Sequence, residues 1–117
     1  MKHRKYTRTL GRKTAHRISM MRNMALALFL HRKIETTHIR GLELVRFAER
    51  LVTLAKKEDL ESKRRVFAQL KNKEVARQLF DFAKAQYSTR NGGYTRIIKK
   101  EFRKGDGATL VIVELIQ

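Results

Sequence analysis

Positive charge is the feature that most constrains this chain. Its 117 residues include 28 Lys and Arg but only 11 Asp and Glu, a formal net charge of +17 at pH 7. Like charges at this density repel one another in a compact fold unless a polyanion neutralises them. An anionic membrane is one candidate, but proteins of membrane surfaces gather their charge on one amphipathic helix or one juxtamembrane tract. Here the basic residues run the whole length of the chain, which favours nucleic acid.

The rest of the composition indicates that the chain can form a hydrophobic core. Its hydrophobic content of 42% argues against full disorder, and its length fits one domain over residues 1–117. It has no cysteine, which excludes disulfides and thiolate metal sites. The longest apolar stretch, residues 24–30, is far shorter than the ~18 residues that span a membrane. We therefore expect no membrane contact and a cytoplasmic location.

Acidic residues are missing from the start of the chain. Residues 1–34 contain ten Lys or Arg and no Asp or Glu, and residues 1–13 show no apolar pattern beyond Tyr6 and Leu10. Such a segment cannot bury enough apolar surface to offset its ordering entropy. We predict an extended basic arm over residues 1–13, clamped between RNA helices, and a globular body over residues 14–117. A floppy basic tail with no defined binding site is the alternative.

Four segments carry helix signals. The first runs from an N-cap at Thr14 to about residue 30, and the second follows Thr37 over about 39–57. Asp59 caps a third segment to about residue 70, and Asn72 caps a fourth to about residue 86. The apolar positions that recur at helical spacing are Ile18, Met21, Ala25, Leu28, Phe29, Leu44, Phe47, Ala48, Leu51, Ala55, Leu60, Val66, Phe67, Leu70, Val75, Leu79, Phe82 and Ala83.

Three further segments favour strands. Residues 34–37 are short and β-branched, residues 94–100 alternate with Tyr94, Arg96 and Ile98 on one face, and residues 110–116 are apolar. A Gly-Asp-Gly turn at 105–107 joins the last two into a hairpin. The order predicts an α+β fold, with four helices packed on one face of a small, mostly antiparallel sheet and a basic extended N-terminal arm.

Short motifs follow one another along the whole chain in a specific order, and the glycine-tyrosine stretch is the most specific of them. They are Lys-His-Arg-Lys at 2–5, Leu-Gly-Arg at 10–12, His-Arg at 16–17, Met-Arg-Asn-Met-Ala at 21–25, Ile-Glu-Thr-Thr at 34–37, Leu-Ala-Lys at 54–56, Lys-Arg-Arg at 63–65, Arg-Asn-Gly-Gly-Tyr-Thr-Arg-Ile at 90–97, Phe-Arg-Lys-Gly-Asp-Gly-Ala at 102–108 and Val-Glu-Leu at 113–115. With these motifs the chain resembles the family of bacterial ribosomal protein seventeen of the large subunit. Position 2 is Lys in this chain, whereas arginine is usual in the family. Lysine keeps the positive charge, but it cannot bind a phosphate through two parallel hydrogen bonds as arginine does.

The resemblance implies a function as well as a fold. It implies a structural constituent of the large ribosomal subunit, bound to large-subunit ribosomal RNA near the exit of the peptide tunnel. It also implies contact with large-subunit protein thirty-two, and neither a cofactor nor a small-molecule substrate.

The candidate RNA-binding residues are cations, histidines and one glycine-tyrosine loop. They are Lys2, His3, Arg4, Lys5, Arg8, Arg12 and Lys13 in the arm; His16, Arg17 and Arg22 on the first helix; Arg64 and Arg65 on the third; Arg90, Gly92, Gly93, Tyr94 and Arg96 in the loop and the strand after it; and Arg103 and Lys104 beside the hairpin turn. Lys and Arg would neutralise phosphates. His3 and His16 could stack on bases or donate to phosphates, and plain exposed histidines are the equally good alternative. For each helical cation, a solvated face is the alternative.

The loop and the third helix need separate arguments. Gly92 and Gly93 would let the backbone approach a phosphate, and Tyr94 would offer a stacking face between two guanidinium groups. A turn with a core tyrosine is the alternative. Residues 63–65 place three cations early in a helix, against its dipole. RNA binding would explain that cost, although a solvated face is nearly as good an explanation.

Catalytic and metal chemistry find little support. Glu35 and His38 have the spacing of a metal half-site, but in a strand residues three apart point to opposite faces. No nucleophile with a neighbouring base can be argued from the spacings, so we expect no enzyme. A nucleoid protein with a helix-turn-helix is a rival, but its recognition helix over 73–86 carries Glu74 and Asp81 and few base-reading residues. An RNA-modifying enzyme has only the charge in its favour.

Deletion of residues 1–13 tests the predicted arm. The truncated protein should assemble poorly into large subunits, because the arm is a ligand for RNA, while its thermal unfolding midpoint stays nearly unchanged. Sedimentation of reconstituted particles and thermal denaturation measure the two effects. A large fall in the midpoint would show that the arm belongs to the core.

Overall fold

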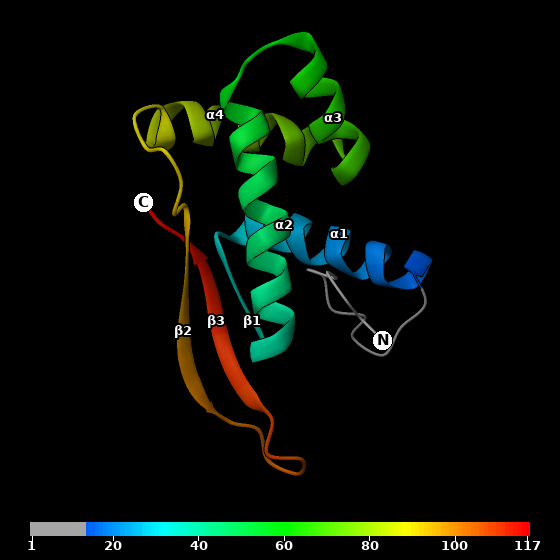
Figure 1. The fold of residues 1–117 in the computed structure, drawn as a ribbon, viewed down its shortest axis with the longest axis vertical. Coiled ribbons are helices and arrows are strands. Elements are labelled where there is room, and N and C mark those ends of the chain that lie inside the picture. Colours follow the sequence, from blue (N-terminus) through cyan, green and yellow to red (C-terminus); the bar gives the residue numbers. More distant parts are fainter. Residues whose placement is uncertain (1–13) are drawn as a thin grey trace, which may run out of the picture.

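The computed structural model describes residues 14–117, which form four helices and three strands (Figure 1). The sequence-predicted α+β class is confirmed. In chain order the elements are α1 (Thr14–His31), β1 (Lys33–Thr37), α2 (His38–Lys56), α3 (Leu60–Leu70), α4 (Lys73–Tyr87), β2 (Thr95–Phe102) and β3 (Thr109–Leu115). Thr14 is the first helical residue of α1 rather than its N-cap. The predicted arm over residues 1–13 lies outside the described residues.

Two of the predicted helix starts are closed by side-chain caps. The Asp59 carboxylate accepts a hydrogen bond from the Ser62 N–H at 2.7 Å, and the Asn72 side chain accepts one from the Val75 N–H at 3.0 Å. Each cap satisfies a donor that the first turn of a helix otherwise leaves unpaired. Thr37 occupies the N-cap position of α2 without a side-chain hydrogen bond. Sequence reasoning therefore located the starts of α2, α3 and α4 correctly.

The three strands form an antiparallel sheet in the order β1-β3-β2. The apolar strand β3 is central, and Ile34, Val113 and Ile97 lie opposite one another across it. Val111 and Val113 are fully buried, whereas Ile98 on the other face is 42% exposed. The alternation predicted for Thr95 to Ile98 is thus confirmed. Strand β2 has a bulge between Lys99 and Glu101, and the hairpin that it forms with β3 extends beyond the helices (Figure 1).

Helix α2 is the centre of the body. It contacts all three strands and the other three helices. Figure 1 shows it lying along the sheet, with α1 crossing behind it and α3 and α4 gathered at its C-terminal end. All four helices were expected to pack on the sheet, but only α1 and α2 contact its strands. Helices α3 and α4 contact other helices and no strand. The molecule therefore has a sheet-covering end and a helical end.

Three apolar side chains that the helical spacing would place in the core are exposed. They are Ile18 (43%), Leu60 (63%) and Phe67 (40%). Ile18 lies in the half of α1 that precedes Met21, the first buried residue of that helix. No other described element covers the faces of α3 that carry Leu60 and Phe67. Helical spacing predicts which face of a helix is apolar. It does not predict how much of that face other helices or strands cover.

Gly41 shows how closely α2 approaches the sheet. A Cβ built on this glycine would lie 2.9 Å from Val111 Cγ2 and 3.2 Å from Val113 Cγ2. Both valines are fully buried, so neither can move freely aside. Glycine is therefore required by packing, not by backbone conformation.

Gly41→Ala should lower the free energy of unfolding by about 1 kcal/mol. Alanine gains about 1 kcal/mol of helix propensity over glycine, but overpacking a filled core costs roughly 1–3 kcal/mol. Urea denaturation measures the difference. Thr53→Ala, at an exposed position of the same helix, is the matched control and should leave stability equal or slightly higher. A stabilised Gly41→Ala protein would contradict the close packing.

Candidate nucleic-acid interface

The loop between α4 and β2 is held to α2 by one lysine. Lys56 Nζ donates to the Arg90 carbonyl oxygen and, at 3.0 Å, to the Tyr94 hydroxyl, which in turn donates to the Arg90 carbonyl at 3.2 Å. Gly92 and Gly93 have φ values of 131° and 64°, a region that side chains disfavour. The loop is therefore a fixed turn, and its two glycines are there for their backbone conformation.

Tyr94 does not offer the stacking face predicted for it. Its side chain is only 2% exposed, and its ring lies 4.9 Å from the ring of Tyr87, centroid to centroid. It precedes β2, and the positive φ of Gly93 turns it inward instead of leaving it on the face of Arg96 and Ile98. The prediction of base stacking by Tyr94 was wrong, and the alternative of a turn with a core tyrosine is the observed arrangement.

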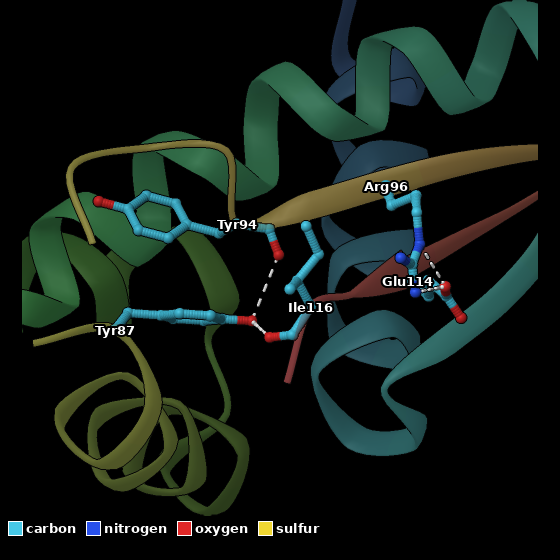
Figure 2. A network of polar contacts seen from close by, with 5 residues as sticks. All are labelled: Tyr87, Tyr94, Arg96, Glu114 and Ile116. Carbon is cyan, nitrogen blue, oxygen red and sulfur yellow. Dashed lines mark hydrogen bonds and ion pairs between the residues drawn. The ribbon is translucent and has the colours of Figure 1, made fainter. Parts of the chain in front are cut away.

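Tyr87 joins the loop to the end of the chain. Its hydroxyl donates to the carbonyl oxygens of Tyr94, at 3.3 Å, and of Ile116 (Figure 2). The Ile116 N–H donates to the same Tyr94 carbonyl at 2.9 Å. Burial raises the pKa of the Tyr87 hydroxyl to about 12, because the phenolate would lose its hydration. A neutral buried hydroxyl therefore fastens the last residues to the loop.

Three of the predicted RNA-binding arginines have acidic partners on the protein itself. Arg96 Nε donates to Glu114 Oε1 at 2.7 Å across the sheet (Figure 2), and Arg65 donates to Glu61 at 2.8 Å along α3. Arg103 binds Asp106 at the hairpin turn and holds the pKa of that carboxyl down at about 2, with help from the Ala108 N–H. These pairs are exposed and add little stability. They do lower the positive charge that these three side chains present to an external anion.

Other predicted cations have no acidic partner among residues 14–117. Arg17, Arg64 and Lys104 form no hydrogen bond or ion pair there, and Arg90 and Arg22 donate only to the carbonyls of Gly93 and Gln69. His16 is exposed near the start of α1. These residues lie on α1, on α3, which α1 contacts, at the α4–β2 loop and at the hairpin tip, and Figure 1 shows the loop and the hairpin tip at opposite ends of the sheet. The structure thus spreads them over a broad surface and does not gather them into one site.

The arm residues lie outside the described residues. They are Lys2, His3, Arg4, Lys5, Arg8, Arg12 and Lys13. Within residues 14–117, no three His, Asp or Glu side chains gather as metal ligands. None of the helices there is both long and apolar enough to cross a membrane.

Sequence reasoning missed the residues that hold the loop and the start of β2. Glu49 Oε1 accepts hydrogen bonds from the Thr95 N–H at 3.1 Å and from the Thr95 hydroxyl at 2.8 Å. Glu49 and Lys56 are seven residues apart on α2, a spacing that puts both on one side of a helix. That spacing was a usable signal for a shared contact, although it does not name the partner.

Comparison with known proteins decides the family. The family model described as ribosomal protein L17 matches residues 20–116. The chain belongs to the ribosomal protein L17 family. Two relatives are both named large ribosomal subunit protein bL17. That of Fusobacterium nucleatum is 47% identical over 116 residues, or 99% of this chain and 100% of its own, and that of Moorella thermoacetica is 47% identical over 109 residues, or 93% and 97%.

The L17 match covers nearly all of the described body. It includes the loop at 90–94, the ion-paired strands β2 and β3 and the helical end formed by α3 and α4. A third L17 relative, from Desulforapulum autotrophicum, is 44% identical over 99% of this chain and 97% of its own. The resemblance stated from short motifs is therefore confirmed over the full length of the fold.

Tyr87→Phe should lower the free energy of unfolding by about 1–2 kcal/mol at neutral pH, because the hydroxyl proton that the carbonyls of Tyr94 and Ile116 share is lost. The pKa of Tyr87 is about 12 in the folded protein and near 10 in an unfolded chain. The unfolded state therefore releases the proton first, and this contribution is lost as pH rises from about 10 to 12.

Urea denaturation at several pH values between 8 and 12 measures both effects. The gap in stability between the native protein and Tyr87→Phe should narrow above pH 10, while the titration of lysines affects both proteins alike. A gap that stays constant with pH would contradict a buried, neutral Tyr87.

Proposed function

We propose that this protein is a structural constituent of the large ribosomal subunit that binds large-subunit ribosomal RNA through phosphate contacts. Its L17 relatives carry the name of large ribosomal subunit proteins. The observation that carries the proposal is unneutralised charge. Residues 1–13 hold six of the 28 Lys and Arg and none of the acids, so eleven of the seventeen excess positive charges lie on the described body.

The acids of the body do not neutralise it. Glu114, Asp106 and Glu35 pair with cations of the sheet and hairpin, and Glu49 serves the backbone of Thr95. Arg17, Arg64 and Lys104 are left for external anions, as is Arg90, whose loop is held in place by Lys56. A folded RNA supplies anions on several sides at once, which suits cations spread over several elements.

The arm and the loop would be the two leading contacts. The acid-free arm over residues 1–13 would lie between RNA helices, and the Gly-Gly turn would let the backbone and Arg90 approach a phosphate. Residues 1–117 would act as one domain. A place near the peptide exit, beside large-subunit protein thirty-two, is supported by the family resemblance alone.

Affinity for ribosomal RNA should fall steeply with salt. If about eight phosphates are neutralised, the slope of log K against log salt should be on the order of −6 to −7. Filter binding of the purified chain to deproteinised large-subunit RNA over a range of KCl concentrations measures it. A nearly flat slope would contradict binding driven by phosphates.

A matched pair of triple variants shows which cations are responsible. Arg17→Gln/Arg64→Gln/Lys104→Gln removes three cations without acidic partners among the described residues. Arg46→Gln/Lys84→Gln/Lys100→Gln removes three that are ion-paired. The first variant should make the slope shallower by about 2, and the second should change it less. Equal effects would show that only net charge matters.

A further inference from the structure

A groove between α3 and α4 is not explained by any of the contacts described so far. Lys63, Arg64 and Phe67 line it from α3, and Lys73, Arg77 and Phe80 line it from α4. The groove is open and measures about 520 Å³, within the roughly 300–1,000 Å³ of sites that hold small ligands. The two helices that line it, α3 and α4, lie at the helical end of the molecule, away from the sheet (Figure 1).

The groove is strongly cationic. None of its four Lys and Arg side chains forms an ion pair within residues 14–117, and Asp81 is the single acid that lines it. The neighbouring Arg65 pairs with Glu61 instead. Lys63 and Arg64 lie in the early part of α3 and Lys73 begins α4, where the helix dipole disfavours cations. An anion held between the two helices would offset that cost.

Two aromatic rings, Phe67 and Phe80, line the groove. Phe67 is 40% exposed although its helical face is apolar, and Phe80 is partly buried against the core. Lys63 Nζ lies 6.0 Å from the centre of the Phe80 ring. On each helix a cation precedes the phenylalanine by about one turn, Lys63 before Phe67 and Arg77 before Phe80. Cations and accessible rings therefore lie side by side.

We propose that this groove binds an unpaired nucleotide of an RNA strand. The base stacks on Phe67 and Phe80, and the adjoining phosphates lie against Lys63, Arg64, Lys73 and Arg77. Base stacking on aromatic side chains is open to unpaired nucleotides, whereas the bases of a duplex are stacked on one another. An acidic protein segment would satisfy the cations, but its Asp and Glu side chains would not stack on the two rings. The assignment rests on the proposed RNA-binding function and adds a contact site to it.

The test uses the full-length chain and deproteinised large-subunit ribosomal RNA. Phe67→Ala removes the more exposed ring and should weaken binding about tenfold at fixed salt. Lys73→Gln/Arg77→Gln should weaken it and make the salt slope shallower by roughly 1.5. The matched control Lys57→Gln/Lys99→Gln removes two exposed cations outside the groove and should have a smaller effect. Thermal midpoints of all variants establish that the fold is intact.

A second probe isolates the stacking. A short single-stranded RNA should bind the native protein more tightly than a duplex of the same length, and Phe67→Ala should abolish that preference. Normal RNA binding by both groove variants, with the native protein still binding, would overturn the groove assignment and leave the proposed function standing. Large-subunit particles that still incorporate the groove variants but lack a neighbouring protein would show that the groove binds a protein instead of RNA. A native protein that does not bind ribosomal RNA would overturn both proposals.

Discussion

The structure depends on the close contact between α2 and the central strand of the sheet. Gly41 lets the start of α2 reach Val111 and Val113, and further along the helix Glu49 and Lys56 hold the start of β2 and the loop before it. One helix thus positions the sheet, the loop and the helical end. A displacement of α2 would disturb all three, because interiors packed at crystal density transmit such shifts.

The acidic and basic residues of the body have different roles. Several of the scarce acids serve the fold: Glu49 holds Thr95, Asp59 caps α3, and Glu114 and Asp106 pair with arginines of the hairpin. The more numerous cations are left with few internal partners. Such a body is poorly neutralised alone, and its folded state is favoured wherever anions surround it. This links the composition of the chain to its place in a ribonucleoprotein particle.

Much of the fold could be predicted from local patterns. The caps at Asp59 and Asn72, the alternation from Thr95 to Ile98 and the order of elements were all correct. Tyr94 was assigned to the face of Arg96 and Ile98 because the alternation was extended back to it, but Tyr94 precedes β2 and follows Gly93, whose φ is positive. Ile18 and Phe67 lie on apolar faces but stay exposed, because burial depends on which other element covers a face.

The sequence by itself determined the class of partner, the element order and the family. Net charge, helical spacing and short motifs do not depend on which distant residues come into contact. Only the tertiary structure decided which cations remain available. Arg96 and Glu114 are 18 residues apart and Lys100 and Glu35 are 65 apart, yet strand pairing brings each pair into contact. The packing of α3 against α4 likewise brought Lys63, Phe67, Arg77 and Phe80 to one groove. Contacts between distant residues are set by packing as a whole, which no local pattern encodes.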